Sequence, residues 1–376
     1  MRVVIVSRGY PTKRFPTHGI FEFDQARALV KAGIEVIFFC VDLRSIFRRR
    51  KLGFFDKMID GVRTIGFNVP LGRIPYKIKR FIGRLCFKKG MRYINKKVWV
   101  PDIIHSHYYF IGEFADKYCK ENNVKCLLTE HSSVVHNTES SNFKFVKRLS
   151  NVYSNYNKIL CVSSSLKRRI ESLVSKKCYV VPNIVDTSVF NFIERRDCTF
   201  NILSVGELKR IKRMDYLISY FSKLDLNKFN SLIIIGDGPE KRHLLKEIND
   251  LDLKNRVKLL GEKNRRDIFE ISKQCNCFCL LSESETFGVA FIEAISSGLP
   301  VISTHCGGPE DFINDKNGQI INLNEKSFER ALDEIRTHHN SLLAKESSVE
   351  IKEMFSPTVV ASKLIENYKE VLKEES

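Results

Sequence analysis

The amino-acid sequence predicts an α/β protein made of two Rossmann-like halves, each built on a parallel sheet. A chain of 376 residues exceeds the size at which a single hydrophobic core stops growing, which favours two domains. Short apolar runs alternate with segments of helical periodicity in both halves, an order typical of parallel sheets with crossover helices. Glycine-containing turns follow several of the apolar runs, as expected where a strand leads into a helix.

The first half begins with a strand at residues 2–7, a helix at 20–32 and a second strand at 34–40. This βαβ order implies a parallel sheet. The loop between the first strand and the helix is long and rich in turn residues, and such loops, at the carboxyl ends of parallel strands, hold ligands. A basic helix is predicted at 76–98, and further strands are predicted at 103–105, 126–129, 158–162 and 178–181.

The second half repeats this alternation after a charged segment without clear periodicity, which we interpret as a linker. Strands are predicted at 200–205, 231–235, 257–260, 277–281 and 300–303, with helices at 214–224, 241–251, 267–273 and 357–373. The predicted organisation is a first domain over residues 1–185, a linker over 186–198, a second domain over 199–356 and a terminal helix within 357–376.

Composition indicates a soluble globular protein, since 43% of the residues are hydrophobic and 11% aromatic. The first apolar run is too short for a signal peptide, and no segment approaches the roughly 18 apolar residues of a membrane span. The eleven cysteines lack the spacing of a metal site. Cys275, Cys277 and Cys279 alternate, so we interpret them as core residues on one face of a strand, with the reduced thiols of a cytoplasmic protein.

Positive charge is concentrated in one basic window, residues 44–97. The window holds 17 Lys or Arg residues against two carboxylates, a net charge of +15 out of +18 for the chain. It is expected to attract an anion, either nucleic acid, acidic lipid or a phosphorylated substrate. A solubilising face is the alternative, although solubilising charge would be spread more evenly.

The helix predicted at 76–98 carries an apolar stripe flanked by Lys and Arg. The stripe consists of Ile78, Phe81, Ile82, Leu85 and Cys86, and it loses phase near Gly90. One interpretation is a helix packed on the sheet with a solvated basic back, and the other is an interfacial helix on anionic lipid. We favour packing of the stripe, with lipid or lipid phosphate contacting the charges.

The stretch 282–294, SESETFGVAFIEA, joins a predicted strand to a predicted helix and is the main candidate site. The helix would direct free backbone amides at a ligand. Glu285 and Glu293 place one carboxylate in the loop and another about a turn into the helix. This arrangement suits a phosphate-bearing ligand with hydroxyl groups, and an ordinary strand–loop–helix corner with two surface glutamates is the alternative.

Other candidate groups also follow predicted strands. The loop at 206–213 contains four basic residues within five positions, which either clamp a diphosphate or form a solvated charge run. His131 closes a strand of the first half, and His105 and His107 close another. Asp237 lies in a glycine-rich turn that is more typical of a tight strand-to-helix connection than of a dinucleotide fingerprint. Zinc spacing, a GxSxG elbow and a Walker lysine loop are absent from the sequence.

In order, these stretches resemble the family 4 retaining glycosyltransferases, which have the GT-B fold, and the similarity covers almost the whole chain. The element from Glu285 to Glu293 is similar to the family's Glu-x7-Glu motif. The other matching segments are Tyr10-Pro11 with Pro16 and Gly19, residues 21–33, 102–107, 129–131, 181–190, 236–239 and 298–308.

The resemblance implies two Rossmann-like domains that face each other across a cleft, with a terminal helix that crosses back to the first domain. It also implies a nucleoside-diphosphate sugar held mainly by the second domain and an acceptor in the first. The residues matched to catalysis are His131, Lys212 and Glu285. Those matched to donor binding are Gly19, Arg210, Arg213, Phe287, Gly288, Val289 and Glu293.

By this resemblance, Glu293 would bond the donor ribose and Glu285 the sugar hydroxyls. The amides of Gly288 and Val289 would meet the diphosphate, and Lys212 would neutralise it as it leaves. His131 would lie near the donor sugar and the acceptor, and Gly19 would approach the phosphates from the first domain. A departing diphosphate needs fixed positive charge, and an oxocarbenium-like sugar needs a nearby carboxylate or dipole. Such enzymes usually need neither a metal nor another cofactor.

One position departs from the family pattern, because Glu207 stands where an arginine commonly follows the glycine of this loop. Either Arg210 or Arg213 supplies the second cation, or the donor phosphates are held differently.

The expected function is a retaining glycosyltransferase that moves a sugar to a glycan or lipid-linked acceptor, in cell-surface polysaccharide or glycolipid synthesis. The expected location is cytoplasmic, peripheral on the inner face of a membrane that the basic window 44–97 contacts. One alternative is a nucleic-acid-binding protein that uses this window, although it contains no recognised nucleic-acid motif. The other is a GT-B protein that binds a partner without catalysis. The sequence leaves the donor base, the sugar and the acceptor open.

Overall fold

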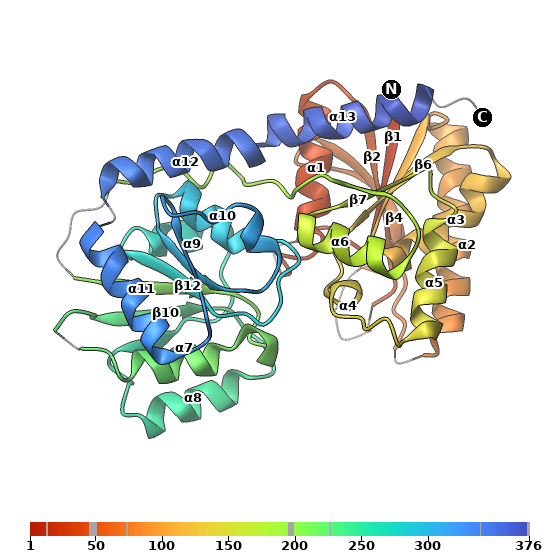
Figure 1. Ribbon diagram of the computed structural model, residues 1–376. Helices are drawn as coiled ribbons and strands as arrows, with labels where there is room; N and C mark the ends of the chain where they lie inside the picture. The colour runs from red at the N-terminus through yellow and green to blue at the C-terminus, as the bar shows by residue number, and fades with distance from the viewer. Residues whose placement is uncertain are drawn as a thin grey trace. The chain divides into compact units, whose positions relative to one another are not determined.

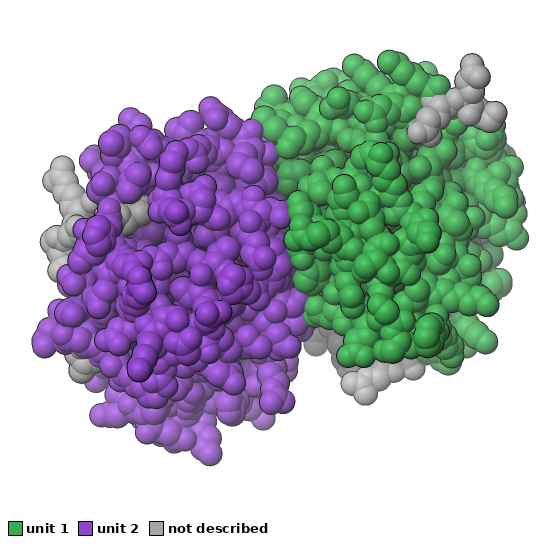
Figure 2. All heavy atoms as spheres, in the orientation of Figure 1, with its two compact units in different colours: residues 1–184, 357–376 green, residues 185–356 purple. Residues whose placement is uncertain are grey.

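Two α/β units make up the chain in the computed structural model (Figures 1 and 2). Unit 1 comprises residues 1–184 and 357–376, and unit 2 comprises residues 185–356. The structure describes residues 1–12, 14–44, 51–72, 74–194, 199–225, 227–338 and 340–373. Part of the basic window (45–50 and 73) and of the predicted linker (195–198) therefore lies outside the described residues.

Unit 1 is built on an eight-stranded sheet in the order β3-β4-β2-β1-β5-β6-β7-β8, counted over the described residues. All pairings are parallel except that of β3 with β4. The strands are β1 (Arg2–Ser7), β2 (Glu35–Asp42), β3 (Gly53–Ile59), β4 (Val62–Asn68), β5 (Ile103–His107), β6 (Lys125–Glu130), β7 (Lys158–Cys161) and β8 (Cys178–Val180). The helices are α1 (Ile20–Lys31), α2 (Tyr76–Lys97), α3 (Tyr109–Glu121), α4 (Ser133–His136), α5 (Phe143–Tyr153), α6 (Ser164–Leu173) and α13 (Pro357–Lys373).

Helices cover both faces of this sheet. On one face α1 lies beside α13 (Figure 1), and their apolar side chains share a core with alternate residues of β1 and β2. The members from α13 are Val360, Ala361, Leu364, Tyr368 and Val371. On the other face α2 packs against α3, β2 and β4. The terminal helix predicted at 357–373 is thus confirmed, and it completes the core of the first half.

The β3–β4 hairpin was not expected from the sequence. It lies inside the basic window and forms the edge of the sheet. β3 is largely exposed and lacks a clear alternation of apolar and polar residues. Its sequence pattern therefore does not predict a strand.

Helix α2 is continuous over 22 residues, and the predicted packing of its apolar stripe is wrong for Ile78, Phe81 and Leu85, which are exposed. Its buried face consists of Gly83, Cys86, Phe87, Gly90, Met91 and Ile94. A Cβ at Gly83 would lie 2.4 Å from the ring of Phe114, and one at Gly90 would lie 2.1 Å from the ring of Phe39. Because the two glycines admit these rings, the helix packs through them, and much of the apolar stripe faces outward.

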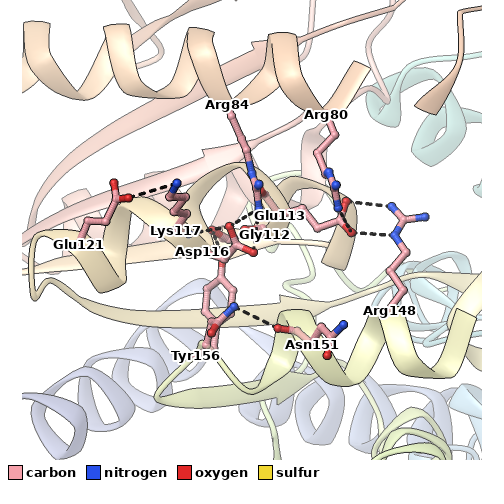
Figure 3. A network of polar contacts seen from close by, with 12 residues as sticks. Arg80, Arg84, Gly112, Glu113, Asp116, Lys117, Glu121, Arg148, Asn151 and Tyr156 are labelled. Atoms are coloured by element: carbon pink, nitrogen blue, oxygen red, sulfur yellow. Dashed lines mark hydrogen bonds and ion pairs between the residues drawn. The ribbon is translucent and has the colours of Figure 1, made fainter. Parts of the chain in front are cut away.

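An ion-pair network holds α2 against α3 and α5 (Figure 3). Glu113 of α3 is buried and accepts two hydrogen bonds from Arg148 of α5, at 2.7 and 2.9 Å. Arg84 of α2 donates to the Glu113 carbonyl and to Asp116, each at 2.8 Å, and Arg80 lies 4.0 Å from the Glu113 carboxylate. The bidentate geometry and the several donors compensate the cost of burying this carboxylate, so α2 is fixed in its rotation about its own axis.

Unit 2 has a six-stranded, fully parallel sheet in the order β11-β10-β9-β12-β13-β14, again over the described residues. Its strands are β9 (Asn201–Val205), β10 (Ser231–Ile235), β11 (Val257–Leu259), β12 (Cys277–Leu280), β13 (Val301–Thr304) and β14 (Gly318–Ile321). Its helices are α7 (Met214–Phe221), α8 (Lys241–Asp250), α9 (Arg265–Ser272), α10 (Val289–Ser296), α11 (Glu325–His338) and α12 (Ser341–Phe355). The prediction of two Rossmann-like parallel sheets is confirmed.

No helix among the described residues has the length and apolar character needed to cross a membrane.

Candidate functional site

The predicted strand–loop–helix corner is present in unit 2, where β12 leads through residues 281–288 into α10. Gly288 caps the helix with a φ of 91°, a left-handed conformation that glycine adopts without strain. A Cβ here would also lie 2.9 Å from both Phe291 and Pro309. The first backbone N–H groups of α10, starting at Val289, precede the regular hydrogen bonds of the helix, and Phe291 N already donates to the Gly288 carbonyl at 3.0 Å. They form the end of a helix that attracts negative charge.

Glu285 and Lys212, predicted from separate loops, lie together at this corner. Lys212 Nζ is 2.5 Å from Glu285 Oε1, and the Ser282 hydroxyl donates to the same oxygen at 2.7 Å. The loop itself is anchored, because Glu285 N donates to the Cys306 carbonyl at 2.7 Å and Gly308 N donates to the Glu285 carbonyl at 2.9 Å. The cation and the carboxylate are therefore held in a fixed relation beside α10.

The basic loop after β9 supplies Lys212 from a short 3-10 turn, Arg210–Lys212. Its backbone is tied to the β12 loop, since Glu283 N donates to the Ile211 carbonyl at 2.8 Å. Arg213 lies 3.5 Å from the Glu283 carboxylate, whereas Arg210 is exposed. Glu207, the departure from the family pattern, lies 2.8 Å from Lys209 at the surface.

Glu293 is buried on α10, and the structure gives it a partner that sequence reasoning missed. Arg265 Nε, at the start of α9, lies 3.1 Å from Glu293 Oε1, and Arg265 Nη1 lies 3.9 Å from Asp186 Oδ2. The only sequence signal for Arg265 was its place in a basic segment just before a predicted helix. The Arg265 guanidinium therefore orients the Glu293 carboxylate.

Phe287 differs from the other residues of this stretch. Its side chain is buried and packs against Phe312 and Phe355, with ring centroids 5.6 and 5.4 Å away. The ring thus belongs to the core of unit 2, and only the Phe287 backbone remains for a ligand. Asp237 accepts from the amide of Gly238 and lies 2.7 Å from Lys241 Nζ, which agrees with a tight-turn role.

Gly19 and His131 belong to unit 1. Gly19 caps α1 with a φ of 69°, and a Cβ on it would lie 2.2 Å from the carbonyl oxygen of Gly9. Only glycine fits this close approach of two backbone segments. The prediction that Gly19 contacts the donor phosphates is not tested by this packing.

His131 follows β6 directly and is almost fully buried. Its Nε2 lies 2.9 Å from His107 Nδ1, and its ring packs on Tyr108 with centroids 5.0 Å apart. The Arg8 guanidinium lies over the Tyr108 ring at 4.6 Å. Burial, assisted by the positive charge of Arg8, lowers the pKa of His131 to about 3, so its imidazole is neutral near pH 7.

The buried histidines predict a loss of stability in acid. Burial lowers the pKa of both His105 and His131 to about 3. Between pH 6.5 and 3 the unfolded chain binds a proton at each of them and the folded chain does not. The free energy of unfolding will therefore fall between pH 7 and pH 5, by about 2 kcal/mol for each histidine. Denaturant unfolding of wild type and His105→Asn at both pH values isolates one of them.

The variant should lose about 2 kcal/mol less than wild type over this pH range. The comparison cancels the opposing contribution of buried carboxyls such as Glu22 and Glu130, whose pKa values burial raises. Equal losses in the two proteins would contradict a neutral buried His105.

Unit 2 thus brings together Lys212, Glu285 and the start of α10, with Glu293 further along that helix. His131 and Gly19 belong to unit 1, where His131 follows β6 and Gly19 caps α1. Sequence reasoning missed Arg265, Ser282, Arg8 and the pairing of His107. Ser282 and His107 stand in segments that the sequence had marked, but their partners could not be read from it, whereas Arg8 and Arg265 stand in no pattern that identifies them.

Comparison with known families agrees with this geometry. Residues 189–344 match the family model of glycosyl transferases group 1, and residues 23–189 match the model of glycosyltransferase family 4. The two matches adjoin and together span most of the chain. The match over 189–344 contains the Lys212–Glu285 pair, and the match over 23–189 contains His131.

Relatives and solved structures point the same way. An uncharacterised glycosyltransferase of Methanocaldococcus jannaschii is 27% identical over 303 residues, 77% of this chain and 81% of that protein. One component of the human phosphatidylinositol N-acetylglucosaminyltransferase is 32% identical over 240 residues, 59% of this chain and 48% of that protein. The structure of a sucrose-phosphate synthase from Thermosynechococcus elongatus superposes with a TM-score of 0.82 at 18% identity and covers both chains fully. The chain therefore belongs to glycosyltransferase family 4, the retaining GT-B enzymes that transfer a sugar from a nucleotide-sugar donor.

Proposed function

We propose that this enzyme adds its sugar to a lipid-linked or glycan acceptor at the surface of an anionic membrane. The pathway that fits is synthesis of a cell-surface polysaccharide or glycolipid, with the protein peripheral on the cytosolic face. The observation that carries the proposal is the outward face of α2.

That face is apolar in its first half and basic in its second. Ile78, Phe81 and Leu85 are 49%, 62% and 48% exposed, and their spacing of three and four residues places them on one side of the helix. Four cations follow on the same side of the helix: Lys88, Lys89, Arg92 and Lys96. All four are exposed, and none forms an ion pair with another described residue. Exposed apolar side chains next to unpaired cations are typical of helices that lie in a membrane interface.

Charge and packing suit this role. The cations of α2 that point toward the protein, Arg80 and Arg84, are paired with Glu113 and Asp116, so those that point away are left for an external anion. Each lysine or arginine near an anionic bilayer contributes about 1 kcal/mol of attraction. Because the Glu113 network fixes α2 (Figure 3), little ordering is needed before this face binds.

One relative supports a lipid acceptor. The human protein with 32% identity is, by its name, part of a phosphatidylinositol N-acetylglucosaminyltransferase, and phosphatidylinositol is a lipid. An acceptor of similar kind would give this chain a reason to present an apolar and basic helix.

We further propose roles for the site residues. In unit 2, the start of α10 and Lys212 would stabilise the leaving diphosphate, and Glu293 would accept hydrogen bonds from the ribose hydroxyls. Glu285 Oε1 already accepts from Lys212 and Ser282, so its second oxygen is placed to accept from a sugar hydroxyl. Arg210 and Arg213 would supply further positive charge, and in unit 1 His131 and Gly19 are the predicted contacts.

Removal of the apolar face should weaken membrane binding. The variant Ile78→Ser/Phe81→Ser/Leu85→Ser is expected to reduce partitioning onto phosphatidylglycerol-containing vesicles about a hundredfold. This corresponds to roughly 1 kcal/mol lost per partly buried side chain. Flotation on sucrose gradients measures the partitioning directly.

A matched control replaces two exposed leucines of unit 2, Leu245→Ser/Leu342→Ser, and should float like wild type. High salt should weaken binding by screening the charges. Equal flotation with neutral and anionic vesicles, or no effect of the triple substitution, would contradict the membrane proposal.

A further inference from the structure

Two buried histidines of unit 1, His107 and His131, contact each other. His107, the last residue of β5, lies within hydrogen-bond distance of His131, with 2.9 Å between Nδ1 of the first and Nε2 of the second. The rings are nearly parallel, with an angle of 25° between their planes. His107 is 0% exposed and His131 is 7% exposed, so His107 lies behind His131 as seen from the surface.

The two rings share one hydrogen in this bond. Burial holds the pKa of both imidazoles below the usual value of 6.5, so each neutral ring carries a single N–H near pH 7. If His107 donates from Nδ1, the hydrogen of His131 must be on its own Nδ1. If His131 donates from Nε2 instead, its Nδ1 is a bare acceptor. The tautomer of one ring therefore determines that of the other.

The two remaining nitrogens decide between these states. His107 Nε2 and His131 Nδ1 are buried without a hydrogen-bond partner among the described residues. Buried N–H groups without an acceptor are rarer than acceptors without a donor. When His131 donates, His107 Nε2 carries an unpaired N–H in the deep interior whatever binds outside. When His107 donates, the unpaired N–H is on His131, whose ring lies nearer the surface, and a ligand that packs against this ring would have to supply the acceptor.

The backbone of His131 is fixed independently of this bond. Glu130 is fully buried, and its Oε1 accepts from the amides of His131 and Ser132 at 2.9 Å each. Its Oε2 accepts from Tyr109 N and the Tyr153 hydroxyl, also at 2.9 Å. Since Glu130 already anchors the main chain, the freedom left to His131 is the rotation and tautomer of its ring.

We propose that His107 is a positioning residue that fixes the ring and tautomer of His131, so that His131 offers Nδ1–H to a sugar hydroxyl oxygen. The inference rests on the proposed place of His131 beside the reacting sugar. The tautomer itself is a property of the protein alone, so it can be tested without any substrate.

The direct test is long-range ¹H–¹⁵N correlation NMR of the full chain labelled with ¹⁵N-histidine. The chain has nine histidines, and the His131 signals are assigned by their loss in His131→Gln. A pyrrole-type Nδ1 and a pyridine-type Nε2 on His131 support the proposal. The reverse pattern overturns it.

Two substitutions of His107 separate positioning from packing. In His107→Asn the amide N–H lies near the position of Nδ1, so the ¹⁵N pattern of His131 should be preserved. In His107→Phe the ring remains but the hydrogen bond to His131 is lost, so His131 should populate both of its tautomers. With a nucleotide-sugar donor that the enzyme accepts, His107→Phe should lower kcat about tenfold, the size of one lost hydrogen bond, with the donor KM little changed. His107→Asn should retain most of kcat.

A matched control is His105→Asn on the same strand. His105 is buried but bonds to Tyr368 and Thr129, at 2.6 and 2.7 Å, rather than to His131. This variant should lose stability while the His131 signals stay in place. Identical His131 signals in wild type and folded His107→Phe overturn the proposal. If His107→Phe does not fold, the wild-type and His107→Asn spectra still decide. Failure to bind any nucleotide sugar would instead count against the proposed function.

Discussion

Replacement of Lys212 by alanine is expected to lower kcat for sugar transfer by about 10²–10³-fold. This is the usual effect of removing one preorganised group that stabilises developing charge. Lys212 Nζ is held 2.5 Å from Glu285 in a half-buried loop that hydrogen-bonds to the β12 loop. Its charge is therefore in place before the diphosphate departs. Single-turnover transfer, measured with saturating donor, reports this step.

Glu285→Ala provides the partner for a double-mutant cycle. Since the two side chains share a hydrogen bond, the kcat of the double variant should be close to that of the slower single variant. The fold-losses in kcat of the two single variants should not multiply. Lys209→Ala is the matched control, because Lys209 comes from the same loop but is exposed and paired with Glu207. Wild-type rates in both single variants would show that the site is elsewhere, and additive losses would show that the pair does not act as a unit.

Glu293→Ala should weaken the binding of the nucleoside diphosphate about 10- to 100-fold, the range for losing hydrogen bonds to a charged group. Glu293 is buried on α10 and oriented by Arg265 at 3.1 Å, so its carboxylate is preorganised for a pair of hydroxyl groups. Calorimetric titration with UDP, GDP and ADP measures the loss and identifies the preferred base.

The control for this experiment is Glu270→Ala, an exposed carboxylate on α9 that pairs with Lys273. Glu293→Gln keeps an acceptor oxygen and should bind with intermediate affinity. Unchanged affinity in Glu293→Ala would contradict a contact between Glu293 and the ribose, whatever the effect of the Lys212 substitution.

Much of the fold could be predicted from sequence, because buried parallel strands are short apolar runs with turn residues at their ends. Residues 231–235 and 357–373 were predicted with the bounds that the structure gives. The failures have physical causes. β3 is an exposed edge strand without an apolar face, and the buried face of α2 passes through Gly83 and Gly90, which a search for apolar side chains ignores.

The site was predictable where a local motif carries it and not where contacts link distant segments. Glu285, Gly288 and Glu293 stand in one stretch, and the pairing of Lys212 with Glu285 joins two loops that sequence reasoning had already marked. The roles of Arg265 and His107 could be inferred only from the structure, which places Arg265 beside the Glu293 carboxylate and His107 beside the His131 imidazole. The periodicity of apolar residues predicts which side of a helix or strand is buried, but it does not predict which side chains of other elements contact that side.

The contribution of α13 to unit 1 has a consequence for biosynthesis. Val360, Leu364 and Tyr368 belong to the same core as Val3 and Ile5, so this core spans nearly the full length of the polypeptide. A nascent chain can form the parallel strands of residues 1–184, but the apolar face that α13 covers stays open while the whole of unit 2 is translated. Domains generally fold in the order in which they emerge from the ribosome. Here the first sheet to be synthesised is the last to be completed.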